Sequence, residues 1–375
     1  MSENFCLHPF NGLEVKNDGE LVPCCKFKQY LFDEWKPHNV RDGIDNYLNS
    51  KQVKDLQQQF INGAKPAACV KCWKDEEAGL KSKRQIDNER WQSTVVDDKI
   101  KFISIPIGSL CNLKCRICSP INSSTWIKEY LDLYSVKVPV QDWHKDPTVW
   151  KDLINISQGC LEINIAGGEP FLYTNTEHME LIESLVRNNN AKNINLHYTT
   201  NGTIFPDDKF FELWKQFNLV DLQVSVDDFG KRFEYNRHPA TWDEVKQNLL
   251  KYLENTKQSS NLQLSISTTV SAFTIYYLEE FLIEMMKMNM PKPWLGRLNN
   301  PEYYRPSVFK NDAKLKILEK LSASRIPQVQ SALVWLKDDD SQYWDKFVEM
   351  VKRHDAYRNE KFDEVFFELA GIINR

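Results

Sequence analysis

The sequence predicts an α/β fold, a partial (β/α)6 TIM-like barrel that follows a small cysteine-rich module and precedes a helical extension. Three observations lead to this prediction. From residue 101 onward, short apolar runs alternate with amphipathic segments, which indicates strands alternating with helices. Polar or glycine-containing motifs follow several of those runs. Eight of the nine cysteines lie within the first 118 residues, so metal ligands are expected near the N-terminus.

Composition is typical of a soluble globular protein, with 375 residues, 42% hydrophobic and 27% charged. A net charge of −4 argues against a broad nucleic-acid-binding surface. No apolar run reaches the roughly 20 residues of a membrane span, and the N-terminus lacks a signal-peptide pattern, so we expect a cytoplasmic protein. In that compartment cysteines are more often metal ligands or redox groups than disulfides.

Residues 1–95 are predicted to form the cysteine-rich module. Asn17-Asp-Gly19 predicts a tight turn between two short strands, which would bring the following Cys24 and Cys25 close to Cys6. Ser50 is expected to cap a helix. The charged segment from Lys74 to Trp91 is predicted to be one helix.

Residues 96–300 are predicted to form the barrel, and residues 301–375 the helical extension. Thr241, with Glu244 three residues later, predicts a capping box at the start of a helix. The active site of such a barrel lies at the C-terminal ends of its strands. The six expected strands are 102–107, 161–165, 193–198, 221–226, 262–270 and 294–298.

Three cysteines directly follow the first barrel strand. Cys111, Cys115 and Cys118 lie within eight residues. Closely spaced thiolates are soft ligands that suit iron–sulfur clusters or zinc. Three ligands leave one position on the metal open, and an open position indicates chemistry rather than a purely structural role.

The spacing of these cysteines resembles the signature of the radical S-adenosylmethionine (SAM) superfamily. The resemblance implies that the three thiolates hold a [4Fe–4S] cluster whose fourth iron binds SAM. One-electron reduction by a flavodoxin- or ferredoxin-type protein would cleave SAM to methionine and a 5′-deoxyadenosyl radical, which abstracts hydrogen from a substrate. Ile117 departs from the family pattern, in which an aromatic residue usually precedes the third cysteine. A structural zinc site is the alternative, but no His lies nearby in the sequence.

Motifs at later strand ends extend the resemblance. Gly167-Gly168-Glu169-Pro170 resembles the family's Gly-Gly-Glu-Pro motif, which implies hydrogen bonds to the methionyl ammonium. Ser225 and Arg237 resemble a Ser-x-Asp…Arg segment, which implies that Ser225 contacts the ribose or methionyl group and that Arg237 holds the methionyl carboxylate. Asn201 and Asp227 are grouped with them as candidate SAM-pocket residues, with a simple turn and a structural carboxylate as the alternatives.

A second set of cysteines precedes the barrel. Cys6, Cys69, Cys72 and either Cys24 or Cys25 are sufficient for a tetrahedral zinc site or a fully ligated iron–sulfur cluster. Their pattern resembles the auxiliary-cluster modules called SPASM or twitch, although those modules usually follow the barrel. The resemblance implies an auxiliary [4Fe–4S] cluster on Cys6, Cys24, Cys69 and Cys72, with zinc as the alternative.

We therefore expect an enzyme that modifies a peptide or protein side chain, because relatives with auxiliary clusters often do so. A radical enzyme that acts on a nucleoside or another small molecule is the second hypothesis. A non-catalytic iron–sulfur electron carrier or redox sensor is a third, although a carrier has no use for a SAM pocket. A zinc-stabilised binding module is the fourth.

Overall fold

The computed structural model describes residues 2–33, 35–92, 99–172 and 176–373. The chain forms two compact units. The first comprises Met1–Leu110, Pro139–Tyr198 and Pro206–Val220, and the second comprises Cys111–Val138, Thr199–Phe205 and Asp221–Arg375. The domain boundaries expected after residues 95 and 300 stay a prediction, because contacts alone do not show which parts fold independently.

The N-terminal part of the first unit consists of short helices beside a hairpin. Strands β1 (Gly12–Val15) and β2 (Leu21–Val22) pair in antiparallel fashion. Gly19 takes the left-handed conformation in the turn between them, with φ of 84°. Ser50 caps α3, since its Oγ accepts a hydrogen bond from the Val53 amide. The helices are α1 (His8–Asn11), α2 (Ile44–Leu48), α3 (Lys51–Ile61), α4 (Val70–Glu77) and α5 (Lys83–Arg90).

The prediction of one helix from Lys74 to Trp91 is wrong, because a turn separates α4 from α5. Gly79 adopts φ of 75°, which a continuing helix does not allow. Ser82 then begins α5 with a capping box: its Oγ accepts from the Gln85 amide, and Gln85 Oε1 accepts from the Ser82 amide, both at 3.2 Å. Charge periodicity alone did not reveal this new start.

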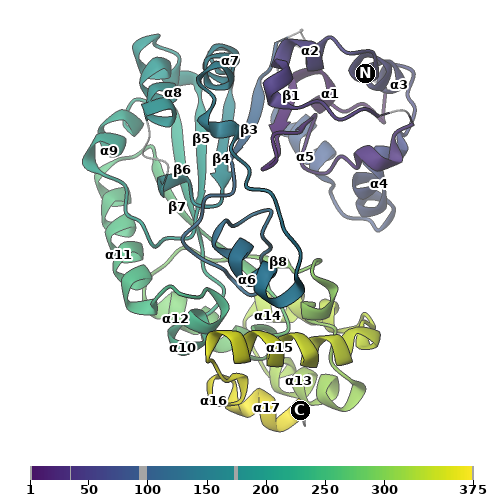
Figure 1. Ribbon diagram of the computed structural model, residues 1–375, viewed down its shortest axis with the longest axis vertical. Coiled ribbons are helices and arrows are strands. Elements are labelled where there is room, and N and C mark those ends of the chain that lie inside the picture. Colours follow the sequence, from purple (N-terminus) through teal and green to yellow (C-terminus); the bar gives the residue numbers. More distant parts are fainter. Residues whose placement is uncertain (1, 34, 93–98, 173–175, 374–375) are drawn as a thin grey trace. The chain divides into compact units, whose positions relative to one another are not determined.

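The six predicted barrel strands are all present, and together with the hairpin they form one sheet in the order β2-β1-β3-β4-β5-β6-β7-β8. Strands β3, β4 and β5 can be seen side by side in Figure 1. β1 pairs in parallel with β3, from Gly12 opposite Phe102 to Glu14 opposite Ser104. The hairpin therefore extends the sheet of the first unit, which the sequence did not indicate. The barrel strands are β3 (Phe102–Ile107), β4 (Glu162–Gly167), β5 (Asn195–Thr200), β6 (Leu219–Ser225), β7 (Leu262–Val270) and β8 (Trp294–Arg297).

Helices alternate with these strands, which confirms the α/β prediction. Thr241 occupies the N-cap of α11, but the predicted capping box does not form, since the Thr241 side chain makes no capping hydrogen bond. Glu234 Oε1 instead accepts from the Trp242 amide at 3.2 Å. The helices are α6 (Thr125–Tyr134), α7 (Pro147–Ser157), α8 (Thr176–Arg187), α9 (Asp208–Trp214), α10 (Gly230–Asn236), α11 (Trp242–Gln258) and α12 (Leu278–Lys287).

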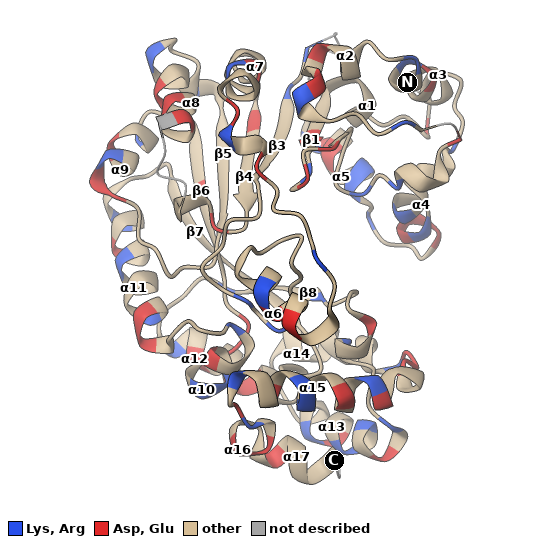
Figure 2. Cartoon of the chain, in the orientation of Figure 1, with Lys and Arg blue, Asp and Glu red and all other residues tan. Residues whose placement is uncertain are grey.

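The C-terminal extension is helical, as predicted, and belongs to the second unit. Phe273 packs against Tyr304, Phe347 and Phe366 with ring centroids 4.7 to 6.0 Å apart, which places an aromatic core beneath these helices. Acidic and basic residues alternate along α15 (Figure 2). The helices are α13 (Asn311–Ser322), α14 (Pro327–Ala332), α15 (Trp344–Arg358), α16 (Phe362–Val365) and α17 (Phe367–Ile373). Within the described part of the chain, no helix has both the length and the apolar character needed to cross a membrane.

Candidate functional site

The three closely spaced cysteines lie on the loop between β3 and α6, in the second unit. The amides of Lys114 and Arg116, on either side of Cys115, donate to carbonyl oxygens of the segment 236–238 at 2.8 Å. Trp126 Nε1 donates to the carbonyl oxygen of Cys115 at 2.9 Å. Hydrogen bonds from two directions therefore hold the backbone around the second cysteine.

The thiols of this loop are shielded from solvent to different extents. Cys111 is buried, and Cys115 and Cys118 are half-buried. The Sγ atom of Cys111 accepts hydrogen bonds from the Leu113 amide at 3.4 Å and from Asn201 Nδ2 at 3.8 Å. The structure thus brings Asn201, a predicted site residue, into contact with the first cysteine.

Two further predicted residues form a buried ion pair in the same unit. Arg237 Nη2 lies 2.8 Å from Asp227 Oδ2, and Asp227 Oδ1 accepts from the Thr269 amide at 2.7 Å. Arg237 Nε is buried and has no hydrogen-bond partner among the described residues. This donor therefore suits an anionic or carbonyl group of a ligand. Ser225 ends β6, two residues before Asp227.

The positive charge of Arg237 affects the pKa values of two cysteines of the loop. Burial raises the pKa of the Cys115 thiol to about 12 and that of Cys118 to about 11, whereas the Arg237 guanidinium acts to lower both pKa values. A bound metal must displace these thiol protons. A permanent cation close by stabilises the thiolates that result.

The motif Gly167–Pro170 lies at the end of β4, in the first unit. The Gly168 amide donates to the carbonyl oxygen of Gly108 at 3.1 Å. A Cβ atom added to Gly168 would lie 2.1 Å from the carbonyl oxygen of Leu110, so only glycine permits this approach. Leu110 directly precedes Cys111 in the sequence, and the motif therefore contacts the backbone that leads into the cysteine loop.

Glu169 is fully buried within this turn. Its amide donates to the carbonyl oxygen of Leu110 at 2.8 Å, and its Oε1 accepts from the Phe171 amide at 3.2 Å. The carboxylate thus shapes the 3-10 turn Pro170–Leu172.

The second predicted set of cysteines gathers in the first unit. Cys6, Cys24, Cys69 and Cys72 line one enclosed cavity, whereas Cys25 is exposed and is not among the residues that line it. The geometry therefore favours Cys24 over Cys25. Within the described ranges, no three His, Cys, Asp or Glu side chains converge closely enough to hold a single metal ion.

Hydrophobic packing brings these four cysteines together from distant parts of the chain. Cys69 and Cys72 lie one helical turn apart at the start of α4, so they share one face. Trp73 Nε1 donates to the carbonyl oxygen of Pro66 at 2.9 Å, which fixes that helix start. The surrounding core consists of Cys6, Val22, Phe27, Leu56, Phe60, Ala68 and Trp73.

Basic residues also line this cavity. Arg84 is buried and makes a bidentate ion pair with Glu76, at 3.0 and 2.7 Å. Its Nη1 donates to the carbonyl oxygens of Glu3 and Phe5 at 2.9 and 2.8 Å, which ties α5 to the segment before Cys6. Lys26 and Lys83 line the cavity beside Arg84, and such cations favour thiolates over thiols.

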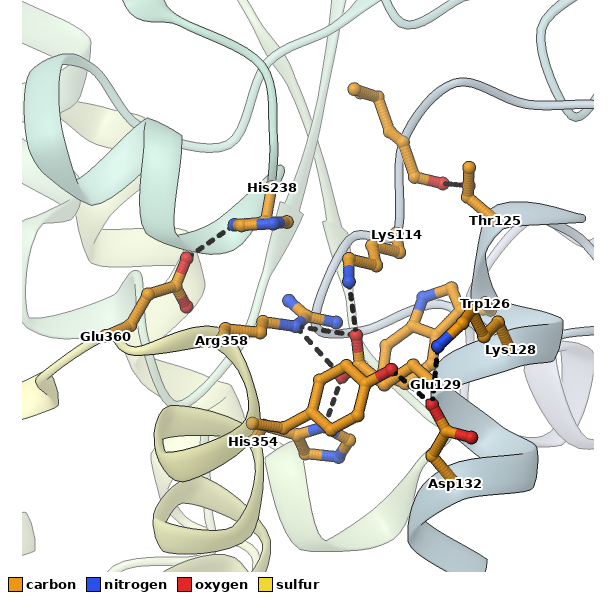
Figure 3. Close-up of polar contacts among 12 residues, drawn as sticks. Lys114, Thr125, Trp126, Lys128, Glu129, Asp132, His238, His354, Arg358 and Glu360 are labelled. Atoms are coloured by element: carbon orange, nitrogen blue, oxygen red, sulfur yellow. Dashed lines mark hydrogen bonds and ion pairs between the residues drawn. The ribbon is translucent and has the colours of Figure 1, made fainter.

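A buried carboxylate that sequence reasoning missed, Glu129 of α6, joins the cysteine loop to α15 (Figure 3). Its oxygens accept from Lys114 Nζ and His354 Nδ1 at 2.8 Å and from Arg358 Nε at 2.9 and 3.1 Å. Although burial opposes ionisation, these donors, His354 foremost, hold the pKa of Glu129 at about 2. The sequence feature that could have indicated a buried Glu129 is its position three residues after Trp126, on the same face of the helix.

Arg116 makes a second connection between the loop and the C-terminal helices. Its Nη2 donates to Asp355 Oδ1 at 2.7 Å and to Glu360, and its guanidinium stacks 3.7 Å from the ring centre of Tyr235. Asp355 also accepts from the Tyr235 hydroxyl at 2.7 Å. Both residues that flank Cys115 are thus bound to carboxylates.

Comparison with protein families gives two matches. The family described as the radical SAM superfamily matches residues 105–270, which contain all three loop cysteines, and the family described as SPASM, an iron–sulfur cluster-binding domain, matches residues 6–73. The chain carries a radical SAM domain and a SPASM domain. The SPASM domain precedes the radical SAM domain, and its match spans Cys6 through Cys72.

Individual relatives are distant. GTP 3′,8-cyclase from Actinobacillus pleuropneumoniae serotype 3 (strain JL03) is 22% identical over 195 residues, which are 48% of each chain. The same enzyme from Haemophilus ducreyi is 24% identical over 185 residues, again 48% of each chain. The chain therefore spans about half the length of the curated relatives it matches.

Two solved structures show a limited likeness. "Native anSMEcpe with bound AdoMet" is 21% identical with a TM-score of 0.41, over 54% of this chain and 52% of that one. SuiB from Streptococcus suis bound to S-adenosylmethionine is 14% identical with a TM-score of 0.38, over 88% of this chain and 70% of that one.

These two domains imply three cofactors: a [4Fe–4S] cluster, SAM and an auxiliary iron–sulfur cluster. The residues present fit them. The cysteine loop offers three thiols beside the unpaired Arg237 Nε, and the SPASM cavity offers four thiols. The description of the SPASM family supports an iron–sulfur cluster there over the zinc alternative.

Proposed function

We propose that the protein is a radical SAM enzyme that abstracts hydrogen from a side chain of a peptide or protein. A reduced [4Fe–4S] cluster with SAM supplies a 5′-deoxyadenosyl radical as the oxidising group. The observation that carries the proposal is the gathering of Cys111, Asn201, Asp227 and Arg237 around one loop of the second unit. An electron carrier needs the thiols alone, without an arginine donor held ready beside them.

The residues of this site have separate proposed roles. Cys111, Cys115 and Cys118 hold the cluster as thiolates, and Arg237 binds the methionyl carboxylate through the donor that has no partner among the described residues. Asp227 orients Arg237 through their 2.8 Å ion pair. By the family resemblance, Gly167–Pro170 would bind the methionyl ammonium through backbone groups. Ser225 would contact the ribose or the methionyl group.

The SPASM cysteines have a different proposed role. Cys6, Cys24, Cys69 and Cys72 hold an auxiliary [4Fe–4S] cluster with all four positions ligated by protein, which suits electron transfer more than substrate binding. Electrons would enter from a flavodoxin- or ferredoxin-type reductant.

A radical SAM enzyme acting on a nucleoside or another small molecule is the second candidate. The relatives named GTP 3′,8-cyclase favour it, although their identity of 22 to 24% is low and their coverage partial. The two candidates share the same radical-generating residues and differ only in the substrate pocket.

The experiment that tests both is anaerobic reconstitution of the full chain, followed by reduction in the presence of SAM. We expect 5′-deoxyadenosine, measured by chromatography and mass spectrometry. Its absence while iron, sulfide and the reduced-cluster EPR signal are intact would exclude a radical SAM enzyme. Incubation with a peptide library or with nucleotides then separates the candidates, because the true substrate raises the rate of 5′-deoxyadenosine formation and gains a new mass.

A further inference from the structure

A cavity of about 460 Å³ lies beside Cys118 in the second unit. Its walls come from the loop after Cys118, from α6, from the segment after β8 and from α15. Its volume lies in the usual range of ligand pockets. None of the residues proposed to bind SAM is among the described residues that line it. The cavity therefore adjoins the radical site through the shared cluster ligand Cys118.

Many of the residues that line this cavity are aromatic or apolar, and contacts within the protein hold several of them in place. The rings of Tyr130 and Tyr134 lie 4.7 Å apart, and the Tyr134 hydroxyl lies 3.3 Å from His354 Nε2. His354 is anchored by its Nδ1 to Glu129, so this wall is held by the network that also binds Lys114 (Figure 3). The aromatic and apolar lining includes Trp126, Tyr130, Tyr134, Tyr303 and Met350.

The positive charges in the walls are compensated within the protein. Arg116 Nη2 is bound by both Asp355 and Glu360, and Lys346 Nζ lies 3.0 Å from Glu349 Oε2. Arg116 Nε and Nη1 are buried and have no hydrogen-bond partner among the described residues, so they can donate to the carbonyl oxygen of an uncharged ligand. The described lining contains no Asp or Glu. A polyanionic ligand would have to compete with these protein carboxylates for Arg116 and Lys346. A cationic ligand would have no carboxylate partner among the described lining residues. An uncharged ligand loses the least hydration on entering such a cavity.

We propose that this cavity is the substrate pocket and that it takes an uncharged aromatic or large apolar side chain presented by a peptide. The inference rests on the proposed function and narrows its substrate class. The hydroxyls of Tyr130 and Tyr303 can bind the peptide backbone, while the rings and Met350 cover the side chain. Cys118 at the edge of the cavity places the bound side chain next to the radical-generating loop.

The test uses the full chain, reconstituted anaerobically and loaded with SAM. The probes are capped tripeptides, acetyl-Ala-X-Ala-amide with X as Tyr, Leu, Lys or Glu, and GTP as the polyanion. Affinity is measured by calorimetry or saturation-transfer NMR. We expect the Tyr or Leu peptide to bind about tenfold or more tightly than the Glu peptide and GTP, since it buries apolar surface without losing charge hydration. Equal binding of all five probes, or tighter binding of GTP, would overturn the proposal.

A blocking variant locates the binding. Asn300 lines the cavity and is exposed, so Asn300→Trp places a large ring at the cavity wall without replacing a core residue, and Lys346→Trp does the same from α15. Asn299→Trp is the matched control, because Asn299 is exposed and is not among the described lining residues. We expect the two blocking variants to weaken peptide binding about tenfold and the control to leave it unchanged.

Failure of the pocket proposal can be distinguished from failure of the proposed function. Formation of 5′-deoxyadenosine without peptide is expected in the native protein and in all three variants, because none alters a residue of the radical site. Its absence in the native protein would overturn the proposed function. Its presence together with unchanged peptide affinity in both blocking variants would overturn the pocket alone.

Discussion

The two cysteine sites of this protein are built in opposite ways. The radical SAM loop takes three cysteines from eight consecutive residues and holds them with hydrogen bonds and ion pairs. The SPASM site takes four cysteines spread over 67 residues, from Cys6 to Cys72, and holds them within a hydrophobic core. Local spacing makes the first site, whereas tertiary packing makes the second.

The difference follows from what each site has to do. A cluster that binds SAM needs an open position and a polar environment for a charged ligand. An auxiliary cluster with four protein ligands needs none, and burial away from solvent tunes its potential. We therefore expect substitutions in the two regions to have separable effects.

Substitution of single cysteines should have the largest effect on product formation and on iron content. Cys115→Ala should abolish 5′-deoxyadenosine formation but leave the auxiliary cluster in place. Cys69→Ala should remove about half of the iron, as expected when one of two [4Fe–4S] clusters is lost. Iron and sulfide analysis with chromatography of the products measures both.

Cys25→Ala is the control for this pair, because Cys25 is exposed and does not line the SPASM cavity. It should keep the full iron content. A loss of iron in Cys25→Ala, with none in Cys24→Ala, would show that the ligand has been assigned to the wrong cysteine.

A single methyl group should damage the radical site while sparing the SPASM site. Gly168→Ala places a Cβ atom 2.1 Å from the Leu110 carbonyl oxygen, so the backbone before Cys111 has to shift. We expect the rate of 5′-deoxyadenosine formation to fall about 100-fold, since displacements near 1 Å have effects of that size on rate. Chromatography of the products measures it. Gly371→Ala, where the added atom meets open space, should form 5′-deoxyadenosine at the normal rate.

Removing the buried carboxylate should loosen the connection between the cysteine loop and α15. Glu129→Gln removes the negative charge that Lys114, His354 and Arg358 share and replaces one acceptor oxygen with an NH2 donor, so we expect the free energy of unfolding to fall by about 3 kcal/mol. The EPR signal of the radical SAM cluster should also change, with that of the auxiliary cluster constant. Asp132→Asn, on the exposed face of α6, should cost under about 1 kcal/mol.

The smallest expected effect is a pH dependence of the folding stability, which arises from Glu14. Burial raises the pKa of Glu14 in β1 to about 7. Between the ordinary value near 4.5 and about 7 the folded state binds more protons than the unfolded state, so stability falls as the pH rises through this interval.

Glu14→Gln should remove this decline, which we expect to be about 1 kcal/mol because solvent screens a half-buried group. Denaturant unfolding at pH 5 and pH 8 measures it. Glu77→Gln, at an exposed position, should retain the decline, and if it does not, Glu14 is not its source.

Much of the fold could be predicted because its signals are local. Alternating runs such as Phe102–Ile107 and Leu262–Val270 predicted the strands, since buried strand faces repeat every second residue. The break was missed because the charged segment from Lys74 to Trp91 was interpreted as a whole, whereas Gly79 takes a positive φ and Ser82 caps a new helix. The Thr241 capping box failed because Glu234 of the neighbouring helix takes part in the helix start instead.

The sequence by itself determined the radical SAM loop, because three thiolates at this spacing can ligate one cluster wherever the loop is placed. Only the tertiary structure decided three other features: Cys24 rather than Cys25 lines the SPASM cavity, Glu129 binds Lys114 to α15, and Cys118 borders an aromatic cavity. The physical reason is chain separation. Lys114 and Arg358 meet through Glu129 across more than 240 residues, and no local pattern encodes a contact between such distant positions.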